Sequence, residues 1–269
     1  MRAGIITLIL GYVLSQFYRA FLAVLTPVLE SDLGASKADL ATASGAWFLA
    51  FALMQIPVGE ALDRIGPRRA TAAALLVGAL GATLFALAQT PGMLTVAMAL
   101  IGVGCSPVLM ASFYIFARTF TPAVFGTLAG VTIGVGSLGN IAASLPLTMA
   151  VEGFGWRQTV WALAAVTALA GGVVAALVRD PPRVVATGER GSVLTLLAMP
   201  ALWPIFAMMI VCYAPAAGLR GLWLGPYFSD VYGLDRPGVG QVSLWMGLAM
   251  VAGNFAYGPL DRWLGTRKW

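Results

Sequence analysis

The sequence predicts an all-α membrane protein, with a six-helix transmembrane bundle followed by the first two helices of a second, repeat-related bundle. Of its 269 residues, 59% are hydrophobic and only 10% are charged, which is too little charge to hydrate the surface of a soluble domain. The apolar residues form long runs that can cross a hydrocarbon core of ~30 Å as helices. Helices are expected because lipid offers the backbone no hydrogen-bond partners.

Eight apolar runs define the expected spans. They cover residues 4–28, 40–60, 70–89, 93–116, 124–149, 157–178, 200–228 and 239–260. Prolines inside the runs are tolerated because neighbouring helices satisfy the freed backbone groups. The longest polar stretch contains two adjacent prolines and mixed charges, which is typical of a linker. The predicted domains are a six-helix bundle at 1–178, a cytoplasmic linker at 179–198 and an incomplete second bundle at 199–269.

The first run could be mistaken for a secretion signal because it follows a basic residue. Arg19 interrupts this run, no cleavage site of small residues follows it, and further spans come after it. We therefore expect the first helix to be retained in the mature protein.

The basic residues are unevenly distributed between the two sides of the predicted membrane. Eleven of the 16 Lys and Arg residues lie in segments on the side of the N-terminus, and three lie on the other side. The positive-inside rule places both ends of this chain in the cytoplasm. The net charge of +5 is thus a topology signal and indicates no nucleic-acid partner. We expect a monomeric, multi-pass protein of the cell membrane, specifically a bacterial inner membrane.

The sequence offers little for catalysis. It contains no histidine, which excludes histidine metal sites, His-based triads and imidazole proton relays. Cys105 and Cys212 lie deep in apolar runs, where buried thiols are expected instead of a metal site or a disulfide. No pair of nucleophile and base is evident, so neither an enzyme nor a metal or cofactor is predicted.

Two patterns recur about 200 residues apart. Tyr12 and Arg19 are seven residues apart in the first run, and Tyr213 and Arg220 repeat this spacing in the seventh. The segment after the second run, Gly59–Arg69, is matched by 258–268 after the eighth. Two unrelated motifs with similar offsets indicate an internal repeat, an arrangement that places a binding site between the halves near the bilayer midplane.

The segment Gly59–Arg69 reads Gly-x-x-x-Asp-Arg-x-Gly-x-Arg-Arg and resembles the loop 2–3 signature of the major facilitator superfamily. The glycine-rich fifth run and Phe-Gly-Trp-Arg at 154–157 are also similar to that superfamily. The resemblance covers the whole chain and implies a carrier of twelve helices in two six-helix bundles. Since this chain ends just after the eighth, we expect a fragment or an incomplete gene product.

Two arginines lie inside predicted spans. Arg19 precedes Val28 by nine residues and Arg220 precedes Phe228 by eight, which places both roughly 12–14 Å below the outer surface. A charge at this depth costs at least ~2.5 kcal/mol, so such residues usually face a cavity or a partner. Polar and aromatic side chains share a face with each arginine at helical spacing. The predicted substrate-binding residues are Arg19, Arg220, Tyr12, Gln16, Trp223, Tyr227 and Asn140.

We interpret the two arginines as a clamp for an anionic substrate, since guanidinium binds carboxylate and phosphate through two parallel hydrogen bonds. Apart from Glu60 at the last position of the second span, no Asp or Glu lies inside a predicted span, so the counter-charge is expected from a ligand. The alternative is a structural ion pair with an acid in the missing helices. The arginines of helices 1 and 7 also resemble those of the organophosphate/phosphate exchangers of the superfamily.

The predicted function is therefore secondary active transport of a small organic or inorganic anion by alternating access. Efflux of apolar drugs or metabolites and anion sensing without transport remain alternatives.

The repeated loop motif predicts a conformational latch. Its residues are Gly59, Asp63, Arg64, Gly66, Arg68 and Arg69 in the first half and Asp261, Arg262, Gly265 and Arg267 in the second. Asp63 is expected to bond to a helix N-terminus of the other bundle in the outward-facing state, and Asp261 to the start of the fifth helix. A positive loop that only sets topology would explain the basic residues but not the repeated aspartate.

The fifth run contains glycines with a spacing of four residues, Gly126, Gly130 and Gly134, which predicts close approach of another helix. Asn140 in the same run either lines a cavity or bonds to a neighbouring helix. Trp47, Trp161 and Trp203 are interpreted as interfacial anchors or packing residues.

Overall fold

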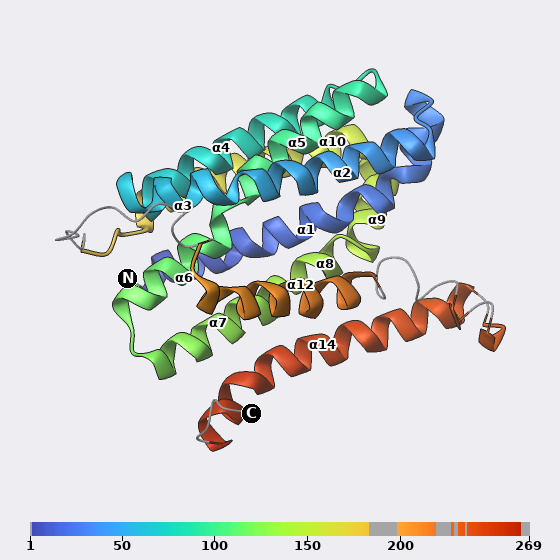
Figure 1. Cartoon of the computed structure of the whole chain (residues 1–269). Coiled ribbons are helices and arrows are strands. Elements are labelled where there is room, and N and C mark those ends of the chain that lie inside the picture. The colour runs from blue at the N-terminus through green and yellow to red at the C-terminus, as the bar shows by residue number, and fades with distance from the viewer. Residues whose placement is uncertain (1, 183–197, 219–226, 229–230, 235, 265–269) are drawn as a thin grey trace. The chain divides into compact units, whose positions relative to one another are not determined.

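The computed structural model describes residues 2–182, 198–218, 227–228, 231–234 and 236–264. All regular elements in these residues are helices (Figure 1). The prediction of an all-α membrane protein is confirmed, because these helices include several that are long and apolar enough to cross a membrane.

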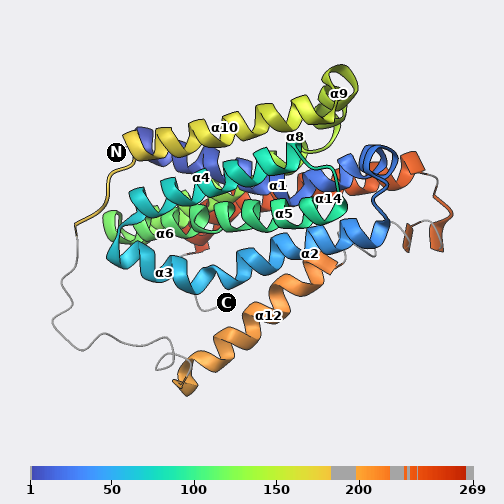
Figure 2. The same cartoon turned by 90° about the horizontal axis from the view of Figure 1, so that it is seen from above.

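The first compact unit contains Met1–Pro182 together with Asn254–Trp269. Figures 1 and 2 show its first ten helices running largely side by side. They are α1 (Arg2–Leu33), α2 (Lys37–Leu53), α3 (Gln55–Arg64), α4 (Pro67–Ala86), α5 (Pro91–Cys105), α6 (Pro107–Thr119), α7 (Pro122–Gly136), α8 (Leu138–Ala142), α9 (Leu145–Phe154) and α10 (Trp156–Leu177).

Among the described residues, five helical segments are long and apolar enough to span a bilayer. They are Ala3–Leu33, Pro67–Ala86, Pro91–Thr119, Pro122–Phe154 and Trp156–Leu177. A sixth span is formed if α2 and α3 are taken together, since they meet at Met54 with a bend of 40°. Each of the six spans predicted between residues 4 and 178 corresponds to one of these segments.

The second compact unit contains Arg183–Gly253. Its described elements are a short 3₁₀ helix η1 (Pro200–Leu202), α12 (Trp203–Gly218) and the first part of α14 (Arg236–Leu264). The predicted span 239–260 lies within α14. Most of the predicted linker, and residues 219–226 of the predicted span 200–228, lie outside the described residues. The domain boundaries remain predictions.

Local sequence explains where several helices begin. Proline stands in the first turn of α4, α5, α6 and α7, where its fixed φ suits a helix and its missing N–H costs nothing. The start of α2 is held by a capping box: the Ser36 hydroxyl accepts a hydrogen bond from the Asp39 amide, and the Asp39 carboxylate accepts one from the Ser36 amide.

The core of the first unit is built around α1, which contacts α2 and every helix from α5 to α10. Aromatic rings continue from α1 to its neighbours: Tyr18 meets Phe21 edge-on at 5.2 Å, and Phe21 lies 5.3 Å from Phe85 of α4. The buried Tyr18 hydroxyl is 2.8 Å from that of Thr167 on α10. Helix α1 is thus held on several sides, which fixes the position of its polar side chains.

Candidate functional site

Arg19 lies in the middle of α1 with its side chain half-buried. Its guanidinium carbon is 5.2 Å from the centre of the Trp47 ring and 4.9 Å from that of Phe51, both on α2. These distances are within the range of a cation–π contact. The structure therefore places the positive charge on a pair of aromatic faces.

The aromatic partners of Arg19 were not predicted from the sequence. Trp47 is only 1% exposed, so it is a packing residue of the core and does not anchor the protein at a membrane interface. The spacing of four residues between Trp47 and Phe51 puts both rings on one side of α2. This four-residue spacing can be read from the sequence, but it does not show which helix the two rings face.

The other polar residues of α1 lie one and two turns before Arg19. The Gln16 amide nitrogen donates a hydrogen bond of 2.6 Å to the hydroxyl of Tyr12. Tyr12 is 5% exposed, whereas Gln16 is half-buried like Arg19. Of these three predicted site residues, Gln16 and Arg19 are accessible to a small molecule, and Tyr12 supports Gln16 from the core.

Helix α8 approaches this part of α1 closely. A Cβ atom added to Gly136 would overlap the Tyr12 ring, and one added to Gly139 would overlap the Val13 carbonyl oxygen. Asn140 follows Gly139 and is half-buried. The glycines thus bring Asn140 to the helix that contains Gln16 and Arg19.

The structure supports only part of the predicted close approach at Gly126, Gly130 and Gly134. Nothing lies within 4 Å of a Cβ atom built on Gly126, whereas one built on Gly134 would lie 2.9 Å from the Phe255 ring of α14. The close contact with α1 uses Gly136, the last residue of α7, and Gly139 of α8. A four-residue glycine spacing indicates a face that permits close packing but does not identify the part of that face that is used.

The second half of the predicted clamp cannot be placed. Arg220 and Trp223 lie outside the described residues, as do Gly265 and Arg267. Tyr227 belongs to a described pair of helical residues and is 47% exposed. Asp261 and Arg262 belong to α14, but the placement of their side chains is outside the description. Their roles stay predictions.

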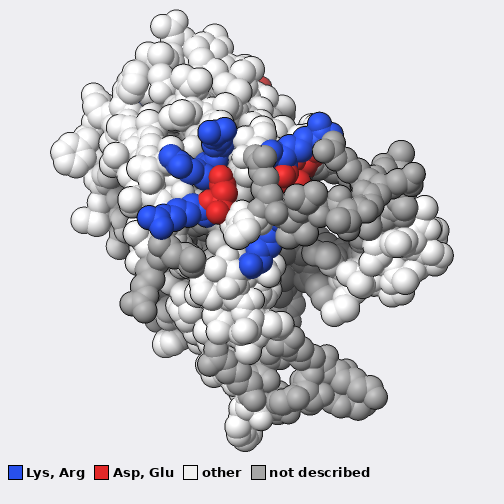
Figure 3. All heavy atoms as spheres, turned by 90° about the vertical axis from the view of Figure 1, so that its left-hand side faces the viewer, with Lys and Arg blue, Asp and Glu red and all other residues white. Residues whose placement is uncertain are grey.

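The first loop motif forms contacts within its own unit. Asp63 at the end of α3 accepts hydrogen bonds from the Tyr114 hydroxyl at 3.0 Å and from Arg118 at 3.3 Å, both on α6. Arg64 pairs with Glu60 at 2.6 Å. Figure 3 shows basic and acidic side chains gathered on one face of the molecule. Asp63 therefore joins the end of α3 to the end of α6.

A second carboxylate, which the sequence analysis did not single out, completes this region. Asp180 follows α10 and accepts a hydrogen bond of 2.7 Å from the backbone N–H of Arg68 in the first turn of α4. The Arg68 side chain donates in return to the Ala175 carbonyl of α10. Asp180 thus satisfies one of the free N–H groups at the positive end of α4.

Gly66 is required here for two reasons. Its φ of +100° is one that other residues rarely adopt, and a Cβ atom on it would lie 2.8 Å from the Asp180 carboxyl carbon. The glycine of the loop signature therefore makes room for Asp180 as well as for the turn.

The Phe-Gly-Trp-Arg segment joins the ends of three helices. Arg157 donates a hydrogen bond of 3.0 Å to the carbonyl of Ala86, the last residue of α4, and one of 2.9 Å to the carbonyl of Ala88, which follows α4. It also contacts the Asp32 carboxylate near the end of α1 at 3.4 Å. The Trp156 indole donates to the same carboxylate oxygen at 3.0 Å. The segment therefore fastens α1 and α4 to the start of α10.

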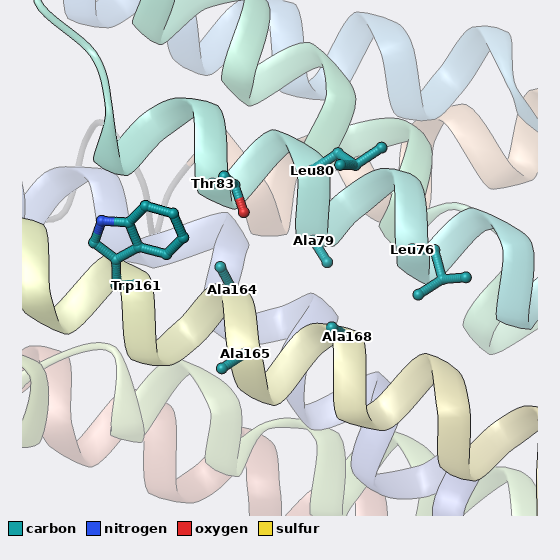
Figure 4. Close-up of a pocket in the computed structure, with 8 residues that line it drawn as sticks. All are labelled: Leu76, Ala79, Leu80, Thr83, Trp161, Ala164, Ala165 and Ala168. Carbon is teal, nitrogen blue, oxygen red and sulfur yellow. The ribbon is translucent and has the colours of Figure 1, made fainter.

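A separate groove of about 380 Å³ runs between α4 and α10 (Figure 4). Its lining is almost entirely apolar and consists of Leu76, Ala79, Leu80, Thr83, Trp161, Ala164, Ala165 and Ala168. Leu80 is 65% exposed, as expected for a side chain that faces hydrocarbon. The groove lacks charged groups and is unsuited to a polar solute.

The spanning helices, the mid-span cation and the basic loop define a multi-pass membrane protein of the carrier class. The family model of the Major Facilitator Superfamily matches residues 8–269, and the chain belongs to this family of transporters. It is thus a membrane transport protein that acts on a small molecule. No curated protein matches the chain.

Solved structures show the same fold. The human organic anion transporter MFSD10 (TETRAN) matches with a TM-score of 0.64 and 18% identity over 96% of this chain and 72% of that one. The proton:xylose symporter XylE, solved with 6-bromo-6-deoxy-D-glucose, matches with a TM-score of 0.60 and 13% identity over 96% and 68%. At these identities the similarity concerns the fold alone.

Proposed function

We propose that this protein moves a small organic or inorganic anion across the membrane by alternating access, with Arg19 as an anion-binding residue. The observation that supports this best is the half-buried guanidinium in the middle of a spanning helix, held against aromatic rings. A membrane-embedded cation of this kind is typical of a substrate pathway.

Gln16 and Asn140 supply the neutral part of the proposed site. Both are half-buried, and both lie where α8 approaches α1. Their amides can donate to the remaining oxygens of a carboxylate or phosphate. Arg220, with Trp223 and Tyr227, is proposed as the corresponding group of the other half, on the grounds of the sequence repeat.

The test is uptake by the full-length protein in liposomes, with inorganic phosphate and succinate as probes. Arg19→Ala and Arg220→Ala should each abolish uptake. Arg179→Ala is the matched control, because it removes an exposed arginine that follows α10 and belongs neither to the proposed site nor to the proposed latch. Anion uptake that survives both substitutions in the spans would refute the anion site. Drug resistance that persists in Arg19→Ala would favour efflux of apolar compounds, and anion binding without flux would favour a sensor.

We further propose that Asp63 and Asp261 act as latches that favour the outward-facing state. Asp63 is 64% exposed despite its contacts with α6, so its second carboxylate oxygen can reach another helix end. Asp63→Asn should increase the labelling, by a membrane-impermeant reagent, of a cysteine introduced at the inner end of a spanning helix. Glu60→Gln is the control, because it neutralises another acid of the same helix. Equal labelling of the two variants would contradict the latch.

The proposed orientation has the N-terminus in the cytoplasm of a bacterial cell, in the inner membrane. Ser36→Cys, between α1 and α2, should then react with an impermeant thiol reagent added to intact cells, whereas Arg64→Cys, after α3, should react only after lysis. The reverse pattern would invert the topology. A monomer is proposed as the oligomeric state, which light scattering of the purified protein can measure.

A further inference from the structure

Arg69 lies on the same face of α4 as the apolar groove. It precedes Leu76, Leu80 and Thr83 of the groove lining by 7, 11 and 14 residues. At about 100° per residue, these four side chains fall within about 60° of one another around the helix axis. Since Arg69 is in the first turn of a spanning helix, this face combines a cation at the membrane surface with an apolar surface inside the membrane.

Helix α10 forms the other side of the groove, and a second arginine lies where the two helices meet. Figure 4 shows the groove between α4 and α10, with Leu76 on one helix and Ala168 on the other. Seven residues beyond Ala168, the Ala175 carbonyl accepts a hydrogen bond from Nε of Arg68. Arg68 therefore bridges the two helices at the same end of α4 as Arg69.

The carboxylates near Arg69 already have partners. They are Glu60, which pairs with Arg64, Asp63, which pairs with Arg118, and Asp180, which accepts from the backbone N–H of Arg68. The Arg69 side chain is exposed and forms no hydrogen bond, ion pair or ring contact with another described residue. This end of the groove therefore has a positive charge that an external anion can balance.

The distances along α4 suit a lipid of one leaflet. At about 1.5 Å per residue, Leu76 lies about 10 Å and Leu80 about 16 Å from Arg69 along the axis. Half of the hydrocarbon core measures about 15 Å. An acyl chain whose headgroup lies at Arg69 thus reaches the part of the groove between these two leucines, which are 49% and 65% exposed.

We propose that Arg69, Arg68 and the adjoining part of the groove bind an anionic phospholipid, with phosphatidylglycerol as its simplest form. The headgroup phosphate pairs with Arg69 through two parallel hydrogen bonds, and one acyl chain lies along Leu76 and Leu80. Basic residues between spanning helices at a membrane surface are a setting that suits such headgroups. A choline headgroup is disfavoured, because its own cation lies close to the two arginines.

This surface shares no residue with the proposed anion site. Loss or survival of uptake in Arg19→Ala therefore bears on the proposed function and leaves the lipid site unaffected. A positive charge that only orients the chain in the membrane would not need to share a face with a groove, and this difference can be measured.

The experiment titrates the purified full-length protein in detergent with dioleoyl phosphatidylglycerol or dioleoyl phosphatidylcholine and counts bound lipids by native mass spectrometry. The unmodified protein should bind phosphatidylglycerol more tightly. Arg69→Gln should raise the Kd for this lipid about five-fold, the effect of one arginine at an anionic surface, and should leave the Kd for phosphatidylcholine unchanged. Arg69→Lys keeps the charge but loses the fork, so its Kd should rise less.

Arg64→Gln is the matched control, because it removes the same charge at the same end of the bundle but from α3. Its Kd for phosphatidylglycerol should change less than about two-fold. Equal rises for Arg64→Gln and Arg69→Gln would overturn the inference, since general surface charge would explain both. Ala168→Leu fills the groove opposite Leu76 and should raise the Kd about four-fold, the value of one methylene group withdrawn from contact. An unchanged Kd would contradict the place given to the chain.

Glycerol phosphate separates a lipid from a free phosphate compound. It has the same phosphate group but no acyl chain, so it should not displace phosphatidylglycerol. Displacement, or equal affinity for the two lipids, would refute the lipid site. The melting temperature of lipid-free Arg69→Gln should equal that of the unmodified protein, because Arg69 contacts no other described side chain; a lower value would assign the arginine a structural role instead.

Discussion

Two glycines of the same loop signature should respond oppositely to the same substitution. Gly66→Ala places a Cβ on a residue with φ of +100°, which costs about 1–2 kcal/mol. The new methyl group also lies 2.8 Å from the Asp180 carboxyl carbon and displaces the group that caps α4, a loss of about 1 kcal/mol. The free energy of unfolding should fall by about 2–3 kcal/mol in total.

Gly59→Ala should instead stabilise the protein. Gly59 lies inside α3, and nothing lies within 4 Å of a Cβ atom built on it. Alanine in a helix interior is favoured over glycine by about 0.5–1 kcal/mol. Neither variant changes the charge of the loop, so the pair isolates the backbone effect.

The assay is thermal unfolding of the purified full-length protein in detergent. For a chain of this size, 1 kcal/mol shifts Tm by roughly 2–4 °C, so Gly66→Ala should lower Tm by about 4–12 °C and Gly59→Ala should raise it by about 1–4 °C. Asp180→Ala should lower the Tm of the unmodified protein more than it lowers the Tm of the Gly66→Ala variant. The reason is that both substitutions remove the same hydrogen bond, from the Arg68 N–H to Asp180. Shifts of the same sign for both glycines, or additive effects with Asp180→Ala, would refute the role given to Gly66.

Three further changes probe the rest of the bundle. Arg157→Ala should lower the free energy of unfolding by about 2–3 kcal/mol, because two buried carbonyls lose their donor and the Asp32 carboxylate keeps only the Trp156 indole; a melting curve like that of the unmodified protein would contradict this. Tyr18→Phe should cost only about 1 kcal/mol, since Thr167 keeps its hydrogen bond to a backbone carbonyl, and a larger loss in the same assay would indicate a further partner. Gly139→Ala should cost about 1–3 kcal/mol by forcing α8 away from α1, whereas Gly126→Ala should not destabilise; equal melting temperatures would disprove the close approach.

The spans could be predicted from the sequence because the length of an apolar run is a local property. The breaks inside them could not. Pro107 was expected within one continuous helix, yet α6 begins at it, and the predicted run 40–60 bends at Met54, one turn before Pro57, whose ring clashes with the carbonyl of Leu53 in a regular helix. Whether a helix continues across such a point depends on which neighbours satisfy its backbone, and this is decided by tertiary packing.

The site was predictable only in part for a related reason. A charge in an apolar run is visible in the sequence, so Arg19 could be singled out. Its ring partners on α2 depend on how two helices face each other. The carbonyls that bind Arg157 belong to Ala86 and Ala88, whose side chains give no hint of this role. Contacts that the backbone makes cannot be predicted from the types of the side chains.

The connections at the two ends of the first unit restrict how it can deform. Arg157 ties three helices together at one end, and Asp180 and Asp63 tie four at the other, so the helices cannot spread independently without breaking charged hydrogen bonds. The bend between α2 and α3 lies between these two sets of ties and has no side-chain cap. Flexing of this unit is therefore expected to concentrate at Met54, three residues beyond Phe51, so that a small change in the bend would alter the surface against which Arg19 rests.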